Sequence, residues 1–195
     1  SQGLGEVYEI LNMDMKPYPC CRSAHCAIDA VLDIRRQMEA HMGLTIQTEG
    51  EAEILAGQIQ KIEIDTYLVG YKQCAVSDGC LHPKTILDAK FSTPYSVAAA
   101  FLYGTVAMGQ FEPEVVEKKA VQDLLAKVIV QPSDRFTEQY PKHWGCFMKL
   151  TMQDGTCYET EVEDPSGSVE RPLSRVQARN KAEEFLSVVC PGREQ

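Results

Sequence analysis

The segment Lys16–Cys26, with the sequence KPYPCCRSAHC, gathers residue types that bind anions or transfer protons. It contains Lys16, Arg22 and His25 and no acidic residue, although the whole chain carries a formal net charge of -9. Ser23 precedes an apolar, helix-like pattern and is of a type that caps helix N-termini. The first amides of a helix are unpaired donors with a partial positive charge, which nearby cationic side chains reinforce. The segment therefore predicts a pocket for a small carboxylate or phosphate ligand.

The same residues also allow a purely structural interpretation. Lys16 then carries a solvated charge, Arg22 pairs with a nearby carboxylate, and His25 is a packed residue in the first helical turn. The cysteines of the segment, Cys20, Cys21 and Cys26, lack the paired CxxC spacing of structural zinc or iron–sulfur sites. We therefore expect no metal. The thiols are interpreted as packing residues, with the alternative that Cys20 and Cys21 are low-pKa thiols beside Lys16 and Arg22.

Length and composition indicate an ordinary globular protein. With 195 residues, of which 44% are hydrophobic, the chain predicts one compact domain over residues 1–195. The acidic net charge argues against binding to nucleic acid, which needs a broad basic surface. The longest apolar run, about residues 97–106, is too short to cross a bilayer core of about 30 Å, so no membrane span is predicted. Eight irregularly spaced cysteines favour reduced thiols and hence a cytoplasmic location.

Hydrophobic periodicity and turn residues predict strands and helices in mixed order. Thr93 and Ser174 are the expected N-caps of the helix from 93 and of the final helix. Gly43 ends the first helix, and Asp154-Gly155 forms a two-residue hairpin turn. These elements predict an α+β fold in which helices cover an antiparallel or mixed sheet. The expected elements are a strand at 6–15, a helix at 24–42, a strand at 58–68, a loop with Gly79 and Pro83, helices from 93 and at 113–126, a strand at 128–130, hairpin strands at 144–152 and 156–163, and a final helix from 174 through Val189.

Four stretches in fixed order resemble the C-terminal domain of the MmgE/PrpD family. They are KPYPCCRSAHCAIDAVLDI, then DAKFSTPYSVAAAFLYG, the Asp-Gly hairpin, and RNKAEEF in the terminal helix, so that the resemblance runs from about Leu4 to Val189. That family contains 2-methylcitrate dehydratases, cis-aconitate decarboxylases and iminodisuccinate epimerases. The resemblance implies a lyase or isomerase that removes a proton next to a carboxylate of a small di- or tricarboxylate, without a cofactor. It does not choose among dehydration, decarboxylation and epimerisation.

The resemblance also implies roles for individual residues. Lys16 would bind or polarise a substrate carboxylate, Arg22 and the Ser23 end of the helix would add donors, and His25 would move a proton or position a neighbour. The family places a tyrosine of its cleft just after the alternating strand. Tyr67 and Tyr71 both fit that description, and the sequence does not decide between them.

Family members carry a larger, mostly helical N-terminal domain that supplies further acid and base groups to the same cleft. No counterpart of it is present in these 195 residues. The resemblance therefore implies a helical domain or subunit as a partner, a homodimer, and little activity for the chain alone. The competing hypothesis is a non-catalytic anion-binding or dimerisation module that retained the fold.

Overall fold

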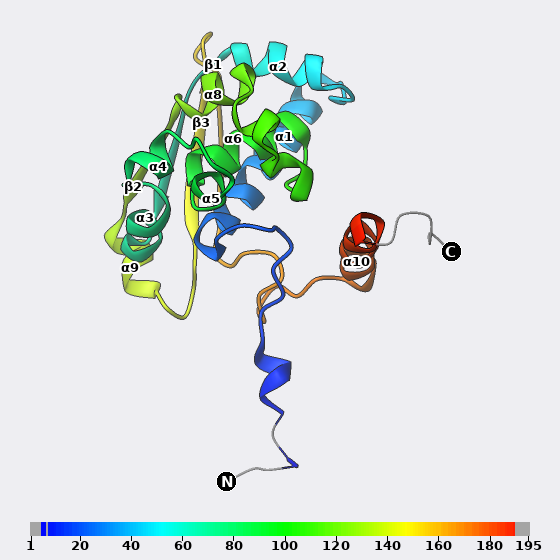
Figure 1. Ribbon diagram of the computed structural model, residues 1–195. Coiled ribbons are helices and arrows are strands. Elements are labelled where there is room, and N and C mark those ends of the chain that lie inside the picture. Colours follow the sequence, from blue (N-terminus) through cyan, green and yellow to red (C-terminus); the bar gives the residue numbers. More distant parts are fainter. Residues whose placement is uncertain (1–4, 7, 190–195) are drawn as a thin grey trace. The chain divides into compact units, whose positions relative to one another are not determined.

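The computed structural model describes residues 5–6 and 8–189 (Figure 1). Its internal contacts divide the chain into two units: one is Tyr18–Pro165, and the other combines Ser1–Pro17 with Ser166–Gln195. We call them the central unit and the terminal unit and describe each by itself. The expectation of one domain over residues 1–195 stays a prediction.

The central unit is built around a four-stranded mixed sheet. The strands are β1 (Ile59–Thr66), β2 (Val128–Pro132), β3 (Cys146–Met152) and β4 (Cys157–Val162), in the spatial order β2-β1-β3-β4. β1 is parallel to β2 and antiparallel to β3, and Ile64 pairs with Val130 on one side and Met148 on the other. Together with the helices below, this sheet confirms the predicted α+β fold with a mixed, helix-covered sheet.

Alternation along β1 separates a core face from a charged face, as the sequence predicted. Ile62 and Ile64 are fully buried, whereas Lys61 and Glu63 point to the other face and form an ion pair of 2.9 Å. On the same charged face, Lys149 of β3 pairs with Glu159 of β4 at 2.7 Å. Apolar and charged residues alternate along these strands because one face of the sheet contacts helices and the other contacts water.

Two helices, α1 (His25–Met42) and α6 (Thr93–Tyr103), cover the core face. α1 packs on β3 and β4, α6 packs on β2, and the two helices contact each other; α2 (Glu49–Gly57) and α8 (Lys119–Leu125) pack against α6 (Figure 1). All residues of α6 from 93 to 102 are buried, which confirms the prediction of a helix at the centre of the packing. α6 is therefore the element around which the helical layer is organised.

Helix ends follow the predicted chemistry with small shifts. α1 ends at Gly43, whose φ of 63° is the left-handed conformation that glycine adopts without steric cost. α6 is capped by Ser92, whose Oγ accepts from the Tyr95 amide at 3.0 Å, so the expected cap at Thr93 is one residue late.

The middle of the central unit contains more short helices than the sequence predicted. The expected loop around Gly79 contains α4 (Asp78–Leu81) and α5 (Ile86–Lys90), and α3 (Leu68–Cys74) and α9 (Asp134–Gln139) were also not predicted. The expected helix at 113–126 is divided into α7 (Pro113–Val116) and α8. Val116 and Val121 are both buried, and five residues of continuous helix would turn them about 140° apart, so the break brings both into the core.

The hairpin around Gly155 is present, but its loop has three residues instead of two. The Gly155 amide donates to the Met152 carbonyl at 3.0 Å, and the Thr156 amide donates to Asp154 Oδ1 at 2.8 Å. Within this loop, Gly155 is the residue with a positive φ, of 88°. This is the common three-residue loop, a type I turn followed by a left-handed glycine bulge.

The terminal unit contains η1 (Glu9–Asn12), a short 3₁₀-helix, and α10 (Arg175–Val189). The expected strand at 6–15 was wrong, because the described residues of this unit offer no strand for it to pair with. The helix after Ser174 is confirmed: Ser174 Oγ accepts from the Gln177 amide at 3.2 Å. The Met15 amide donates to the Gly167 carbonyl at 2.7 Å, which ties the two segments of the unit together.

Among the helices of the described residues, none has the length and apolar character needed to cross a membrane.

Candidate functional site

The predicted anion-binding segment forms a buried turn that leads into α1. Residues Arg22–Ala24 form η2, a single 3₁₀ turn, and the Cys21 amide before it donates to the Lys90 carbonyl at 2.8 Å. Ser23 does not cap α1, because its Oγ donates instead to Gln73 Oε1 at 2.7 Å. The predicted cap was wrong: the 3₁₀ turn starts the helix through backbone bonds, which leaves the Ser23 hydroxyl for a contact with α3.

Arg22 and His25 are joined inside this turn. Their exposed fractions are 8% and 0%, and Arg22 Nη1 lies 3.3 Å from His25 Nδ1. A guanidinium has only N–H donors, so His25 Nδ1 is the acceptor and the imidazole proton is on Nε2. η2 and the first turn of α1 contain no acidic residue. A fixed positive charge therefore lies at the positive end of the α1 dipole.

A tyrosine and a carboxylate complete this cluster. The Tyr18 ring packs edge-on against His25 with centroids 5.1 Å apart, and its hydroxyl donates to Asp29 Oδ1 at 2.6 Å. Burial raises the pKa of the Cys26 thiol, which Asp29 raises further and Arg22 lowers, so both charges act on the same thiol. Asp29 thus balances part of the Arg22 charge while Tyr18 holds the carboxylate in place.

Tyr67 borders the same turn with its hydroxyl directed into the protein. The residue is 1% exposed, its ring stacks on Tyr140 with centroids 4.8 Å apart, and Trp144 packs at its edge. Burial raises the pKa of Tyr67 far above its ordinary value, an effect that the nearby Ser23 hydroxyl partly offsets. No described residue is in hydrogen-bonding geometry with the Tyr67 hydroxyl. Because buried hydroxyls are normally bonded, this one is a candidate donor to a ligand.

Tyr71, the alternative to Tyr67, lies one helical turn further along α3. It is half-buried, and its amide donates to the Tyr67 carbonyl at 3.1 Å. The buried hydroxyl beside Ser23 belongs to Tyr67, which favours Tyr67 as the tyrosine of the cluster.

Gly70 makes room for the Tyr67 ring. A Cβ at position 70 would lie 2.7 Å from Tyr67 Cζ and 3.0 Å from Cε2. The ring is held between α3 and Tyr140, so Gly70→Ala should displace the hydroxyl and destabilise the fold by about 1–3 kcal/mol. Urea unfolding of Gly70→Ala beside Gly57→Ala, where a Cβ meets nothing within 4 Å, measures this effect. Equal stability of the two variants would show that the ring is not confined.

Lys16 belongs to the terminal unit. Its side chain is exposed, and its carbonyl accepts a hydrogen bond from Lys181 Nζ. The structure therefore brings together Arg22, Ser23, His25 and Tyr67 within the central unit, and the proposed role of Lys16 stays a prediction.

Several polar residues of the cluster were not singled out from the sequence. Asp29 follows His25 by four positions, a spacing that places both on one helix face and was available as a signal. Gln73 comes from a helix that the sequence did not predict, so nothing in its neighbourhood indicated contact with Ser23.

In the part of the chain that the structure describes, no three histidine, cysteine, aspartate or glutamate side chains converge as a metal site would require.

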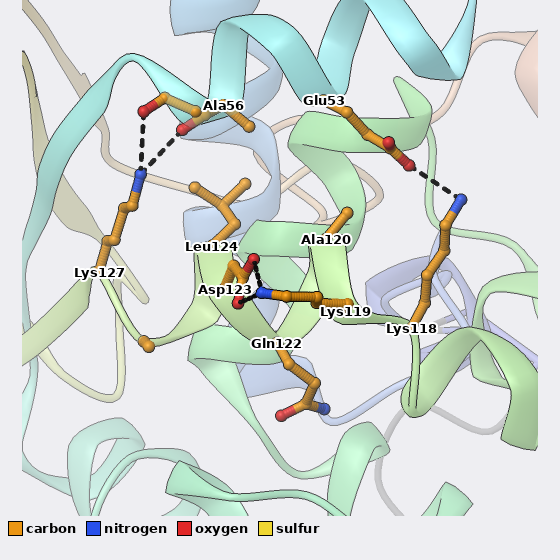
Figure 2. A pocket seen from close by; sticks show the side chains of 11 residues that line it. Glu53, Ala56, Lys118, Lys119, Ala120, Gln122, Asp123, Leu124 and Lys127 are labelled. Carbon is orange, nitrogen blue, oxygen red and sulfur yellow. Dashed lines mark hydrogen bonds and ion pairs between the residues drawn. The ribbon is translucent and has the colours of Figure 1, made fainter.

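A separate cavity of about 800 Å³ lies between α2 and α8 (Figure 2). Three lysines line it, and each is engaged: Lys118 with Glu53 at 3.0 Å, Lys119 with Asp123 at 2.6 Å, and Lys127 with backbone carbonyls. Each of these lysines is held by other groups of the chain, which makes the cavity a weak candidate for an anion site.

Lys127 caps the C-terminal end of α2. Its Nζ donates to the carbonyls of Ala56 at 3.0 Å, Gly57 at 3.4 Å and Ile59 at 2.7 Å, and Figure 2 shows the first two bonds. Lys127→Met removes the donor for these carbonyls and should cost about 1–2 kcal/mol of stability. Chemical denaturation is the measurement, with the exposed Lys119→Met as a control that should change stability by less than about 0.5 kcal/mol. A Lys127→Met protein as stable as the control would contradict the capping role.

Comparison with known proteins identifies the family to which the chain belongs. A family model described as the MmgE/PrpD C-terminal domain matches residues 18–195. Cis-aconitate decarboxylase of Mus musculus is 25% identical over 170 residues, which are 85% of this chain and 31% of that protein. Cis-aconitate decarboxylase-like protein oryM of Aspergillus oryzae is 25% identical over 190 residues, 95% of this chain and 36% of that protein. The chain thus spans about a third of the length of these relatives. Because the family model matches nearly the whole chain, the chain belongs to the MmgE/PrpD family.

Proposed function

We propose that this chain is the carboxylate-binding part of a lyase or isomerase for small di- or tricarboxylates. The observation that carries the proposal is the buried Arg22 guanidinium at the start of α1, beside Ser23 and His25. Arginine offers paired N–H donors that match the two oxygens of a carboxylate. A single concentrated site of this kind suits a small anion within an otherwise acidic protein.

The cluster also has the chemistry to assist proton removal next to a carboxylate. The developing negative charge is stabilised by fixed cations and amide dipoles, which Arg22 and the start of α1 supply. Tyr67 stays protonated because burial raises its pKa, so it acts as a hydrogen-bond donor and not as the base. His25 accepts from Arg22 at Nδ1, so of its two predicted roles this geometry favours positioning a neighbour, with Nε2–H as a hydrogen-bond donor to developing negative charge.

The names of the relatives support a tricarboxylate substrate. Both are named for cis-aconitate decarboxylase, and both are about three times as long as the matched region. We extend this to a substrate of the aconitate or citrate type, with 2-methylcitrate included by family resemblance. The rest of the acid and base groups would come from a helical domain or subunit, in a cytoplasmic homodimer.

The predicted role of Lys16 has a separate test. If its ammonium binds a second carboxylate of the substrate, Lys16→Ala should weaken citrate binding by roughly 10-fold, as loss of a charge-assisted hydrogen bond does. Isothermal titration calorimetry with citrate, carried out on Lys16→Ala and on the wild-type chain, measures this difference in affinity. Unchanged affinity would remove Lys16 from the site and leave the Arg22 cluster unaffected.

Co-expression tests the enzymatic proposal as a whole. The chain is produced with and without a helical MmgE/PrpD domain, and NMR follows exchange of the proton next to a carboxylate of citrate or cis-aconitate in D₂O. Exchange only with both parts present supports the enzyme. Citrate binding without exchange, decarboxylation or dehydration in the combined protein would instead favour the non-catalytic module.

A further inference from the structure

Two thiols lie against each other at the edge of the candidate site. Cys21 directly precedes Arg22, and Cys74 is the last residue of α3. η2 packs against α3, and the Cys21 side chain is the first of the groups that raise the pKa of Cys74, so the two thiols are neighbours across this contact. The Ser23–Gln73 hydrogen bond of 2.7 Å joins the same two segments next to the thiols. The backbone on both sides is therefore already held in place around the sulfur pair.

The two thiols differ in their access to solvent. Cys21 is half-buried, whereas Cys74 has an exposed fraction of 0%. A small oxidant therefore reaches Cys21 first, and Cys74 is in position to react with the product. The Cys21 thiol, burial and other nearby thiols raise the pKa of Cys74, so Cys74 is the less reactive of the two towards an oxidant while both are reduced.

A second thiol pair provides an internal comparison. Cys146 is among the groups that raise the pKa of Cys26, so these two thiols are also neighbours, and their exposed fractions are 3% and 1%. This pair has the same chemistry without an accessible member. Cys157, in contrast, is exposed on β4 and reports whether an oxidant has reacted with the protein.

We propose that Cys21 and Cys74 form a peroxide-sensitive dithiol that closes to a disulfide and fastens the Arg22–Ser23 turn to α3. Hydrogen peroxide oxidises the Cys21 thiol to a sulfenic acid and is itself reduced to water. The Cys74 sulfur then attacks the Cys21 sulfur, the S–O bond breaks, and a second water leaves with the Cys74 proton. The disulfide forms on the protein whether or not the turn binds a carboxylate, so the inference goes beyond the proposed function.

Closure would restrict the groups that the proposed site uses. The crosslink joins the residue before Arg22 to the helix that begins after Tyr67, with Ser23 between them already bonded to Gln73. The Arg22–Ser23 turn should therefore be less mobile in the oxidised protein than in the reduced protein. In this way the oxidation state of the dithiol would control the mobility of the turn.

Peptide mapping tests the proposal directly. Trypsin places Cys20 and Cys21 in the peptide that ends at Arg22, and Cys74 and Cys80 in peptide 73–84, because Lys16 precedes proline. After mild peroxide treatment and alkylation of remaining thiols, a crosslink between these two peptides is expected, about 2 Da lighter than the sum of the reduced peptides. Cys20→Ser and Cys80→Ser should keep the crosslink, and Cys21→Ser and Cys74→Ser should lose it.

The controls make a negative result informative. Peptide 143–149, with Cys146, should remain alkylated and uncrosslinked while the Cys157 peptide shows oxidation. Absence of the 21–74 crosslink under conditions that oxidise Cys157 would overturn the proposal. So would a crosslink that persists in Cys21→Ser, since it would place the disulfide on Cys20. Citrate titration of the reduced protein is independent of both outcomes and reports only on the proposed function.

Discussion

Arg22→Gln is expected to weaken citrate binding to the chain by roughly 10- to 100-fold, the loss that follows removal of a charge-assisted hydrogen bond. Glutamine keeps some of the length and polarity of the side chain but removes the positive charge and the paired donors. The charge should contribute strongly to binding because the Arg22 residue is only 8% exposed at the start of α1, where water screens the charge little. Isothermal titration at low ionic strength is the measurement.

Two companion variants separate the site from general electrostatics and from folding. Arg36 is also on α1, but its side chain is 68% exposed, so Arg36→Gln removes the same charge without touching the turn and should bind citrate normally. Arg22→Lys keeps the charge and should recover part of the affinity if the protein remains folded by circular dichroism. Equal affinity of Arg22→Gln and Arg36→Gln would show that the Arg22 turn does not bind the anion.

Phe101→Ala should destabilise the central unit by about 3–5 kcal/mol, the usual cost of removing a buried phenylalanine side chain. Phe101 is fully buried on α6, the helix that contacts α1, α2, α8 and β2. This loss is a large part of the roughly 5–15 kcal/mol that stabilises a typical domain. Because α6 supports α1 and the turn before it, we expect citrate binding to be lost over the same denaturant range as the fold.

A matched substitution lies ten residues away. Phe91 is 45% exposed beyond the end of α5, so Phe91→Ala removes the same side chain with little cavity and should cost less than about 1 kcal/mol. Urea unfolding of both variants by circular dichroism gives the comparison. Similar midpoints for the two variants would contradict the assignment of α6 to the centre of the core.

The sequence predicted the elements whose burial follows a regular period. Along β1, Ile62 and Ile64 alternate with charged residues, and α6 is rich in alanine and large apolar residues, so both elements have a strong local signal. The break between α7 and α8 has no such signal in composition. It depends on how Val116 and Val121 reach the same core, which is a property of the tertiary structure.

The candidate site was predictable in its residue types but not in its partners. The concentration of cations in the segment before α1 indicated Arg22 and His25, and the structure places them together. Sequence alone did not separate Tyr67 from Tyr71, because the difference is which hydroxyl is buried at the turn. The contact between Ser23 and Gln73 joins positions fifty residues apart, and no local pattern encodes such a pair.

Backbone amide NMR during a citrate titration tests the central claim most directly. If the turn before α1 binds a carboxylate, the amides of Arg22, Ser23 and His25 should shift together and saturate, with the same dissociation constant as in calorimetry. Unmoved amides at this turn, with saturable shifts confined to Lys118, Lys119 and Lys127 around the other cavity, would contradict the account.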